Sequence, residues 1–313
     1  MITNLIMRHL LLLLGVQLLF IALFVPSSAQ AQTSEPNRVE TVKFASKLVG
    51  ATLPYNVVLP SDYDSSPATR YPVLYLLHGL TGHYTDWTTR TNVTDYAAQY
   101  RMIIVTPEGN DGWYTDSAGV PANKYESYIL NELIPDVDAR YRTIQARYGR
   151  AIAGLSMGGY GALKFGLKFP GTFVFAGSMS GALAATALTE TELKDPGAIR
   201  DSILNVFGAA GSETRKANDV FRIVGDLPAG RVASLPYFYL DCGTEDGLVG
   251  DNQKFTALLR EKKIPHEYRE LPGNHSWAYW DQQVQEVLKI AAQKLRLPPA
   301  RTLARVRSNA ISK

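Results

Sequence analysis

A serine with one glycine two residues before it and another two residues after it stands near the middle of the chain, in the run G-L-S-M-G at 154–158. This spacing suits a strained strand-to-helix turn that exposes a nucleophilic serine, because the flanking positions come too close together for larger side chains. A random chain of this length carries the pattern about one time in ten at average glycine and serine usage. Here strand-like residues precede it at 150–153, and apolar residues at helical spacing follow it at 160–168. The segment therefore predicts a nucleophile elbow with Ser156 as the nucleophile.

A serine hydroxyl is a weak nucleophile unless an imidazole removes its proton and an acid orients that imidazole. After an elbow of this kind the chain order is serine, then acid, then histidine. Only His266 and His275 follow Ser156. His266 starts a predicted strand, at the edge of the sheet opposite to the elbow, whereas His275 lies in the loop after that strand. We therefore expect His275 to be the base.

The acid should follow the predicted strand at 237–240, where the candidates are Asp241, Glu245, Asp246 and Asp251. Asp241 still belongs to the strand end and could instead organise the loop by accepting its N–H groups. Asp246 lies far enough into the loop to reach back toward His275, and Glu245 points away if Asp246 points in. The residues favour Asp246 and leave Asp241 and Asp251 open.

A continuous apolar run at 73–77 predicts a strand buried on both faces, and His78-Gly79 ends it. In enzymes with a nucleophile elbow of this kind, the loop after such a strand supplies one backbone N–H of an oxyanion hole, and the residue after the nucleophile supplies the other. These would be the amides of Leu80 and Met157, with Gly79 allowing the chain to turn. A simple strand-ending turn is the alternative.

Alternating strands and helices must position these groups. Strands are predicted at 73–77, 102–105, 150–153, 173–177, 236–241 and 266–271. Helices are predicted at 125–141 with a bend or interruption at Pro135, and at 160–168, 253–262 and 277–295. Two earlier segments, 39–48 and 52–59, alternate apolar and polar residues as half-buried antiparallel strands do. This order predicts an α/β fold with a mostly parallel central sheet and helices on both faces.

The regular alternation is lost between 181 and 235, where charged turns surround short helical pieces. That segment is too short to bury a core of its own, so we expect a helical insertion near the active site that sets substrate choice. Trp113 and Tyr114 follow the strand at 102–105, at the same expected edge of the sheet. They either wall an acyl or aromatic pocket or cover the core.

The 313 residues are 46% hydrophobic and 19% charged, which suits one large α/β domain at 32–295 and excludes disordered and collagen-like classes. The net charge of +3 becomes about −3 for the body once one cation of the leader and five of the C-terminal tail are removed, a balance that does not suggest nucleic-acid binding. Cys242 is the only cysteine, so no intramolecular disulfide can form. The five histidines show no ligand spacing, and neither a metal nor another cofactor is expected.

Residues 1–31 predict a secretory signal peptide, with a charged start, an apolar run at 10–25 and the small-residue pattern A-Q-A at 29–31. We expect the mature protein to begin at Gln32 and to be secreted or periplasmic, without stable membrane insertion. An uncleaved membrane anchor is the alternative, because the apolar run is long for a signal. Residues 296–313 predict a basic flexible tail.

Four motifs together resemble the esterase D-type family of esterases over roughly residues 43–295. They are the elbow G-L-S-M-G-G-Y-G-A, the segment L-H-G-L-T-G at 77–82 with Trp87, the loop C-G-T-E-D at 242–246 with Leu248 and Asn252, and H-S-W at 275–277 with Trp280. The family has the α/β-hydrolase fold and includes S-formylglutathione hydrolases, tributyrin, feruloyl and acetylxylan esterases, and mycolyltransferases. The resemblance implies Asp246 as the acid and adds Trp277 to Trp113 and Tyr114 as substrate-binding candidates.

The resemblance implies a serine carboxylesterase that hydrolyses short-acyl or aryl esters through an acyl-enzyme, and the leader pattern implies that this enzyme is exported. Its small-molecule or carbohydrate-linked substrate would be the main partner. The leader and the lack of cysteine near 77–82 disfavour the formylglutathione hydrolase branch, and G-W-Y-T-D at 112–116 most resembles tributyrin-type esterases. One alternative is an acyltransferase of the mycolyltransferase type that moves the acyl group to a sugar. A remote one is a non-catalytic carbohydrate-binding or scaffold protein on the same fold.

Overall fold

The computed structural model describes residues 38–295, all of which belong to one compact unit. The predictions of a signal peptide at 1–31 and of a basic tail at 296–313 therefore lie outside the described residues. Within the described part of the chain, no helix is long and apolar enough to cross a membrane.

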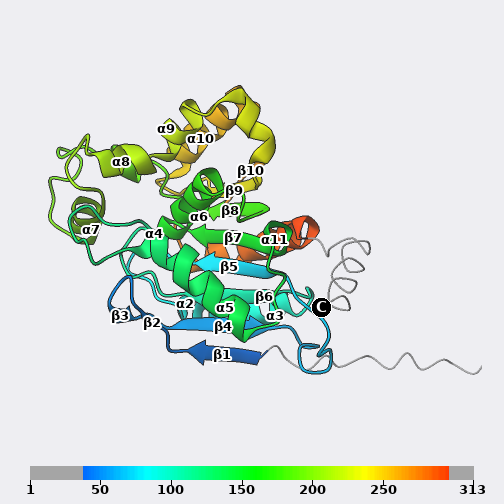
Figure 1. Ribbon diagram of the computed structural model, residues 1–313. Coiled ribbons are helices and arrows are strands. Elements are labelled where there is room, and N and C mark those ends of the chain that lie inside the picture. Colours follow the sequence, from blue (N-terminus) through cyan, green and yellow to red (C-terminus); the bar gives the residue numbers. More distant parts are fainter. Residues whose placement is uncertain (1–37, 296–313) are drawn as a thin grey trace, which may run out of the picture. The chain divides into compact units, whose positions relative to one another are not determined.

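The described residues have the expected α/β architecture, built on an eight-stranded sheet (Figure 1). In spatial order its strands are β1 (Arg38–Val42), β4 (Tyr55–Leu59), β6 (Ile103–Pro107), β5 (Val73–Leu77), β7 (Arg150–Leu155), β8 (Phe175–Met179), β9 (Tyr237–Gly243) and β10 (His266–Leu271). The strands β6, β5, β7, β8, β9 and β10 are all parallel, while β1 and β4 pair antiparallel at one side. A separate two-stranded ladder joins β2 (Ala45–Ser46) to β3 (Ala51–Thr52). Parallel strands bring their carboxyl ends, and the loops that follow them, to one edge of the sheet.

Helices cover both faces of the sheet, as predicted. On one face, the hydrophobic cluster that contains Tyr75 and Leu77 of β5 also contains residues of α4 (Tyr125–Tyr128), α5 (Ile134–Arg140), α6 (Met157–Lys168), α9 (Val220–Gly225) and α10 (Val249–Glu261). On the other face, the hydrophobic cluster that contains Leu74 and Leu76 of β5 also contains residues of α2 (Asp86–Arg90), α3 (Val93–Ala97) and α11 (Trp277–Lys294). Because β5 buries Tyr75 and Leu77 on the first face and Leu74 and Leu76 on the second, a continuous apolar run was required.

The prediction that residues 52–59 form a half-buried strand was wrong, because β4 is buried along its whole length between β1 and β6. Its polar residue, Asn56, is buried with partners: it accepts a hydrogen bond from Thr41 Oγ1 at 2.7 Å and donates one to Thr88 Oγ1 at 3.0 Å. A polar residue in an alternating pattern predicts an exposed position, but here the amide is buried because its hydrogen bonds are made within the protein.

The predicted helix over 125–141 is interrupted, as expected from Pro135. A π-helical turn, η1 (Ile129–Leu133), separates α4 from α5, and Pro135 lies in the first turn of α5. Proline has no N–H for the carbonyl four residues earlier, and its ring would collide with that carbonyl, so the helix widens just before it.

Between β8 and β9 the chain runs through short helices rather than a strand. They are η3 (Ala185–Ala187), α7 (Ala198–Phe207), α8 (Glu213–Asn218), α9 and η4 (Ala229–Ser234). Ile203 of α7 and Val224 of α9 are buried in the same core cluster as β5. The segment therefore shares the core of the sheet and does not build one of its own.

Candidate active site

Ser156 lies in the turn between β7 and α6 with φ 53° and ψ −118°, a conformation that costs a non-glycine residue about 1–3 kcal/mol. The turn is tight. A Cβ on Gly154 would lie 2.5 Å from the backbone carbon of Gly158, and a Cβ on Gly158 would lie 2.5 Å from the carbonyl oxygen of His78. Both distances are too short for any real carbon, which explains why glycine stands at both positions.

His275 joins Ser156 and Asp246 in one hydrogen-bonded row. Its Nε2 is 3.0 Å from Ser156 Oγ, and its Nδ1 is 2.8 Å from Asp246 Oδ2. A carboxylate only accepts hydrogen bonds, so Nδ1 carries the hydrogen and Nε2 of the neutral ring is free to accept the serine proton. This arrangement can activate a serine hydroxyl.

The Asp246 side chain is buried, and its Oδ1 accepts a hydrogen bond of 2.9 Å from the Leu248 N–H. Burial by itself raises the pKa of this carboxyl, but the hydrogen bonds from His275 and from the Leu248 N–H outweigh burial and leave the pKa below its ordinary value. Asp246 is therefore ionised at neutral pH and can stabilise a protonated His275.

The other acids considered from the sequence lie elsewhere. Asp241 is fully buried at the end of β9, and burial raises its pKa to about 7. Glu245 is exposed, and Asp251 forms an ion pair with Lys254 on α10 at 3.0 Å. His266, the other downstream histidine, points Nδ1 at the Ile264 carbonyl at 2.8 Å. The structure thus brings Asp246 alone of the four acids to the imidazole of His275.

The backbone N–H groups of Leu80 and Met157 have no hydrogen-bond partner among residues 38–295. Gly79 packs against the elbow, since a Cβ there would lie 2.6 Å from Leu155 Cδ1 and 3.3 Å from Ser156 Cβ. The loop that carries Leu80 thus runs directly beside the serine. Two unpaired N–H groups next to a nucleophile are what a developing oxyanion requires.

Two cavities open on Ser156 and His275. The larger, about 440 Å³, is mostly apolar and is lined mainly by Leu80, Trp113, Ala182, Ala184, Ala185, Leu188, Ile199, Ile203 and Leu248, with Asp246 and Asp251. The smaller, about 280 Å³, is more polar and is lined by Gly79, Leu80, Thr81, Gly82, Asp86, Arg90, Leu155, Ser276, Trp277 and Trp280. We call them the apolar cavity and the polar cavity. An ester bound across Ser156 would extend one part into each.

The three aromatic candidates have different positions. Trp113 is nearly buried in the wall of the apolar cavity, where its Nε1 donates to Ser202 Oγ at 3.0 Å. Tyr114 is fully buried, packs against Gly161 of α6, and lines neither cavity. The structure contradicts the prediction that Tyr114 contacts substrate, because its ring is outside both cavities and its hydroxyl donates a hydrogen bond of 3.1 Å to the His78 carbonyl.

Trp277 lines the polar cavity, with the guanidinium of Arg90 5.5 Å from its ring centre. Trp87 and Trp280 pack edge-on against it, with ring centres 5.5 and 5.3 Å away. The ring of Trp280 in turn meets His275 edge-on at 4.9 Å. This aromatic cluster therefore connects the wall of the polar cavity to the imidazole.

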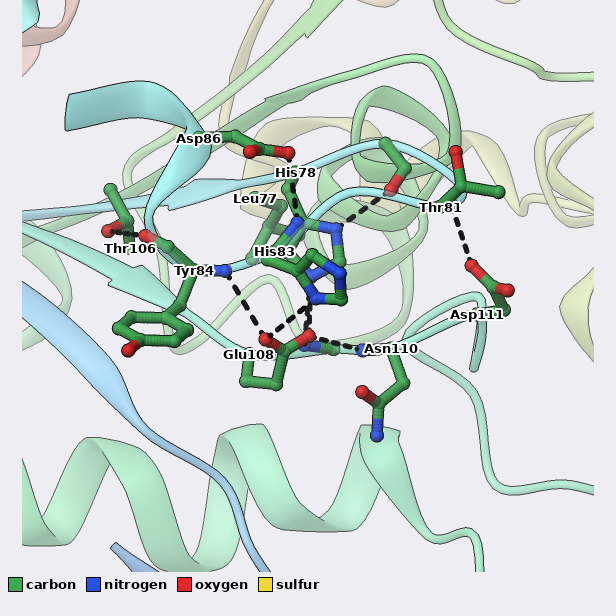
Figure 2. A network of polar contacts seen from close by, with 12 residues as sticks. Leu77, His78, Thr81, His83, Tyr84, Asp86, Thr106, Glu108, Asn110 and Asp111 are labelled. Carbon is green, nitrogen blue, oxygen red and sulfur yellow. Dashed lines mark hydrogen bonds and ion pairs between the residues drawn. The ribbon is translucent and has the colours of Figure 1, made fainter. Parts of the chain in front are cut away.

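Sequence reasoning missed Glu108, whose buried carboxylate lies among His78, His83, Tyr84 and Asn110 (Figure 2). It accepts hydrogen bonds from the N–H groups of Asn110 at 2.9 Å and Tyr84 at 3.4 Å, and lies 3.2 Å from His78 Nε2 and 3.4 Å from His83 Nδ1. Burial raises its pKa, but the His78 interaction and these N–H groups outweigh it and bring the pKa to about 2. The signal was its position in the loop three residues after the predicted strand at 102–105, at the edge that holds the other site residues.

Lys164 was also missed. It is completely buried in α6, and its Nζ donates to the Tyr114 carbonyl at 2.6 Å and to Thr115 Oγ1 at 2.7 Å, and pairs with Glu126 at 2.8 Å. The loop it holds is strained, because Trp113 and Tyr114 both have positive φ, 49° and 50°. A charged residue inside an apolar helical pattern was the available signal.

The family model described as "Putative esterase" matches residues 46–290. An esterase of Mycobacterium tuberculosis is 33% identical over 254 residues, which cover 74% of this chain and 54% of that protein, so the chain spans about half the length of this relative. An acetyl esterase of Caldicellulosiruptor saccharolyticus is 28% identical over 251 residues (78% and 94%). The diacylglycerol acyltransferase/mycolyltransferase Ag85A of Mycobacterium leprae is 28% identical over 319 residues (91% and 93%).

Two solved structures are similar to this chain as well. A ferulic acid esterase superposes with a TM-score of 0.72 at 29% identity, covering 83% of this chain and 99% of that one. A fluorophosphonate-binding serine hydrolase of Staphylococcus aureus superposes with a TM-score of 0.72 at 26% identity, covering 82% and 99%. Both similarities extend over nearly the whole length of the compared chain.

Proposed function

The chain belongs to the esterase family whose model it matches over residues 46–290, and on that premise we propose that it is a serine carboxylesterase. The observation that carries the proposal is the row Ser156–His275–Asp246, with distances of 3.0 and 2.8 Å, beside two N–H groups that have no partner among the described residues. A nucleophile, its base, an orienting acid and oxyanion donors are the groups that acyl transfer needs.

In the first step His275 Nε2 takes the proton of Ser156 Oγ while Oγ bonds to the ester carbonyl carbon. The carbonyl oxygen becomes negative and is held by the N–H groups of Leu80 and Met157, each contributing about a hundredfold or more in rate. When the tetrahedral intermediate collapses, the bond to the alcohol breaks and His275 returns the proton to the leaving oxygen. Water then repeats the sequence on the acyl-enzyme, releasing the acid and restoring Ser156.

The two cavities suggest how the ester is oriented. We assign the acyl group to the apolar cavity, where Trp113 and Ile203 offer apolar contacts to a short aliphatic or aromatic chain. The alcohol then leaves through the polar cavity, where Asp86 and Arg90 can bind hydroxyl groups. This assignment fits short-acyl or aryl esters of a polar alcohol, including a carbohydrate.

The test is release of p-nitrophenol from acetyl, butyryl and longer esters, alongside hydrolysis of methyl ferulate, by the wild type and Ser156→Ala. We expect Ser156→Ala to lose at least about 10³-fold in kcat. Ser234→Ala serves as the control, because Ser234 is exposed and lines neither cavity. Wild-type turnover by Ser156→Ala would refute the proposal. Failure of a fluorophosphonate to label Ser156 would favour a non-catalytic carbohydrate-binding or scaffold role instead.

The polar cavity supports one second candidate, an acyltransferase of the mycolyltransferase type. A sugar in that cavity, held by Asp86 and Arg90 against the ring of Trp277, would present a hydroxyl to the acyl-enzyme in place of water. The similarity to a mycolyltransferase agrees with this candidate. Turnover in the presence of trehalose or another polyol separates the two: acylated sugar indicates transfer, and free acid alone indicates hydrolysis.

We also propose that the protein is exported. The proposal rests on the leader pattern of residues 1–31. Expression of the full chain followed by cell fractionation and mass spectrometry tests it. We expect a periplasmic or secreted product that begins at Gln32, and an uncleaved chain in the membrane fraction would favour the anchor instead.

A further inference from the structure

The peptide group between Gly79 and Leu80 is held in place through its carbonyl oxygen. The Gly79 carbonyl oxygen lies 2.8 Å from His78 Nδ1 and accepts a hydrogen bond of 3.1 Å from the Gly82 N–H. The described residues contain no cis peptide bonds, and in a planar trans peptide the C=O and N–H point in opposite directions. Because both groups belong to one rigid plane, fixing the Gly79 oxygen also fixes the direction of the Leu80 N–H.

The next peptide group is held too. The Thr81 N–H donates to Asp111 Oδ1 at 2.7 Å, and Thr81 has a φ of 60° (Figure 2). Leu80 therefore lies between two anchored peptide planes, and its own N–H has no partner within residues 38–295. An N–H group whose direction is fixed, but which has no hydrogen-bond acceptor, is free to donate to a reacting group.

The tautomer of His78 follows from its contacts. A carbonyl oxygen can only accept, so the Nδ1 that faces Gly79 must carry a hydrogen. On the other side of the ring, Nε2 lies 2.9 Å from the Gly109 N–H and 3.2 Å from the Glu108 carboxylate. In the neutral Nδ1–H form, Nε2 accepts from Gly109, and in the protonated form it donates to Glu108. Both forms keep the hydrogen on Nδ1.

Glu108 and His78 are both buried, so this contact is shielded from water. Glu108 is anchored to its own loop by the Gly109 and Asn110 N–H groups, at 3.1 and 2.9 Å, and reaches the Tyr84 N–H beyond the Leu80 loop at 3.4 Å. It therefore connects the loop after β6 to the loop after β5 and keeps the His78 ring in place (Figure 2).

We propose that His78 is a positioning residue that aims the Leu80 N–H at the oxyanion, with Glu108 as the anchor of the His78 ring. The inference rests on the proposed function, because the Leu80 N–H has this role only if an oxyanion forms on Ser156. His78 does not touch the substrate, and it acts through the orientation of one peptide plane. A misplacement of about 1 Å in such a group can cost 10²-fold in rate.

Two substitutions separate this role from a general structural one. The amide nitrogen of asparagine lies the same number of bonds from Cβ as Nδ1, whereas that of glutamine lies as far as Nε2. His78→Gln should lose the Gly79 hydrogen bond and lower kcat about 10- to 100-fold, with KM within about threefold of the wild type. His78→Asn keeps a donor at the Nδ1 position and should recover kcat to within about fivefold of the wild type.

Binding of a trifluoromethyl ketone, which places an oxyanion on its Ser156 adduct, should weaken in His78→Gln by a factor similar to the loss of kcat. Thr106→Val is the control, because it removes a partly buried hydrogen bond of 2.6 Å to the Tyr84 carbonyl without changing any partner of the Gly79 carbonyl. We expect Thr106→Val to lower the melting temperature and leave kcat unchanged.

Equal losses of kcat in His78→Gln and His78→Asn would overturn the proposal. So would a loss matched by fewer Ser156 sites labelled at saturation by a fluorophosphonate, since that result would report unfolded protein. If the wild type shows no Ser156-dependent turnover, the proposed function itself fails. If turnover is normal and His78→Gln keeps its kcat, only this inference fails.

Discussion

Replacing Gly154 by alanine should damage the elbow by a predictable amount. The added Cβ would lie 2.5 Å from the backbone carbon of Gly158, whereas ordinary contact begins at 3.4 Å, so the turn must open by about 0.9 Å. Gly158 has little free space around it, because a carbon added to its Cα would lie 2.5 Å from the His78 carbonyl oxygen. We expect the free energy of unfolding to fall by about 1–3 kcal/mol, as for other overpacked sites. A shift of this size at Ser156 should lower kcat/KM about 100-fold.

The assay combines p-nitrophenyl butyrate kinetics with urea unfolding and with saturation labelling of Ser156 by a fluorophosphonate, which counts the folded sites. Gly171→Ala is the matched control, because Gly171 is exposed and a Cβ there meets nothing within 4 Å. The control should keep full activity and unchanged or slightly increased stability. If Gly154→Ala keeps both stability and kcat/KM within about threefold of the wild type, the turn is not as tight as the structure indicates.

Three further predictions test the surroundings of the site. The pKa of Glu108 is lowered from 4.5 to about 2, so its charge stabilises the fold above pH 4.5, and this stability is lost as the pH falls toward 2. We therefore expect Glu108→Gln to be less stable than the wild type by on the order of 3 kcal/mol at pH 7 and equally stable near pH 2. Urea unfolding across that pH range measures the difference. Ile199 lines the apolar cavity and is 57% exposed, so Ile199→Ser should change the free energy of unfolding by less than about 0.5 kcal/mol. The same substitution should lower kcat/KM for octanoyl esters, relative to acetyl esters, about three- to tenfold. An unchanged ratio would place the acyl chain elsewhere. Lys164→Met leaves the Tyr114 carbonyl and one side of Glu126 unpaired in the core, and should cost about 3 kcal/mol in the free energy of unfolding; a loss below about 1 kcal/mol would contradict the importance of that buried charge.

Most of the fold was predictable, because each buried strand and amphipathic helix leaves its own period in the sequence. The strands at 73–77 and 266–271 have the predicted bounds in the structure, and the interruption near Pro135 is local proline chemistry. The burial of the strand at 55–59 was not predicted, because it depends on two neighbouring strands. Its polar residue, Asn56, suggested an exposed position, although its side chain is buried and hydrogen-bonded to Thr41 and Thr88. Periodicity within one segment carries no information about its neighbours.

By itself, the sequence determined the elements whose causes are local: the glycine spacing around Ser156, the turn after residues 73–77, and the chain order of serine, acid and histidine. Only the tertiary structure separated Asp246 from the acids that the residues had left open, and only it showed that Tyr114 is buried in the core and that Glu108 contacts His78 beside the Leu80 loop. These contacts join residues from different strand ends at one edge of the sheet. A hydrogen bond requires its two atoms to be about 3 Å apart, and for residues far apart in sequence only the packed sheet sets that distance.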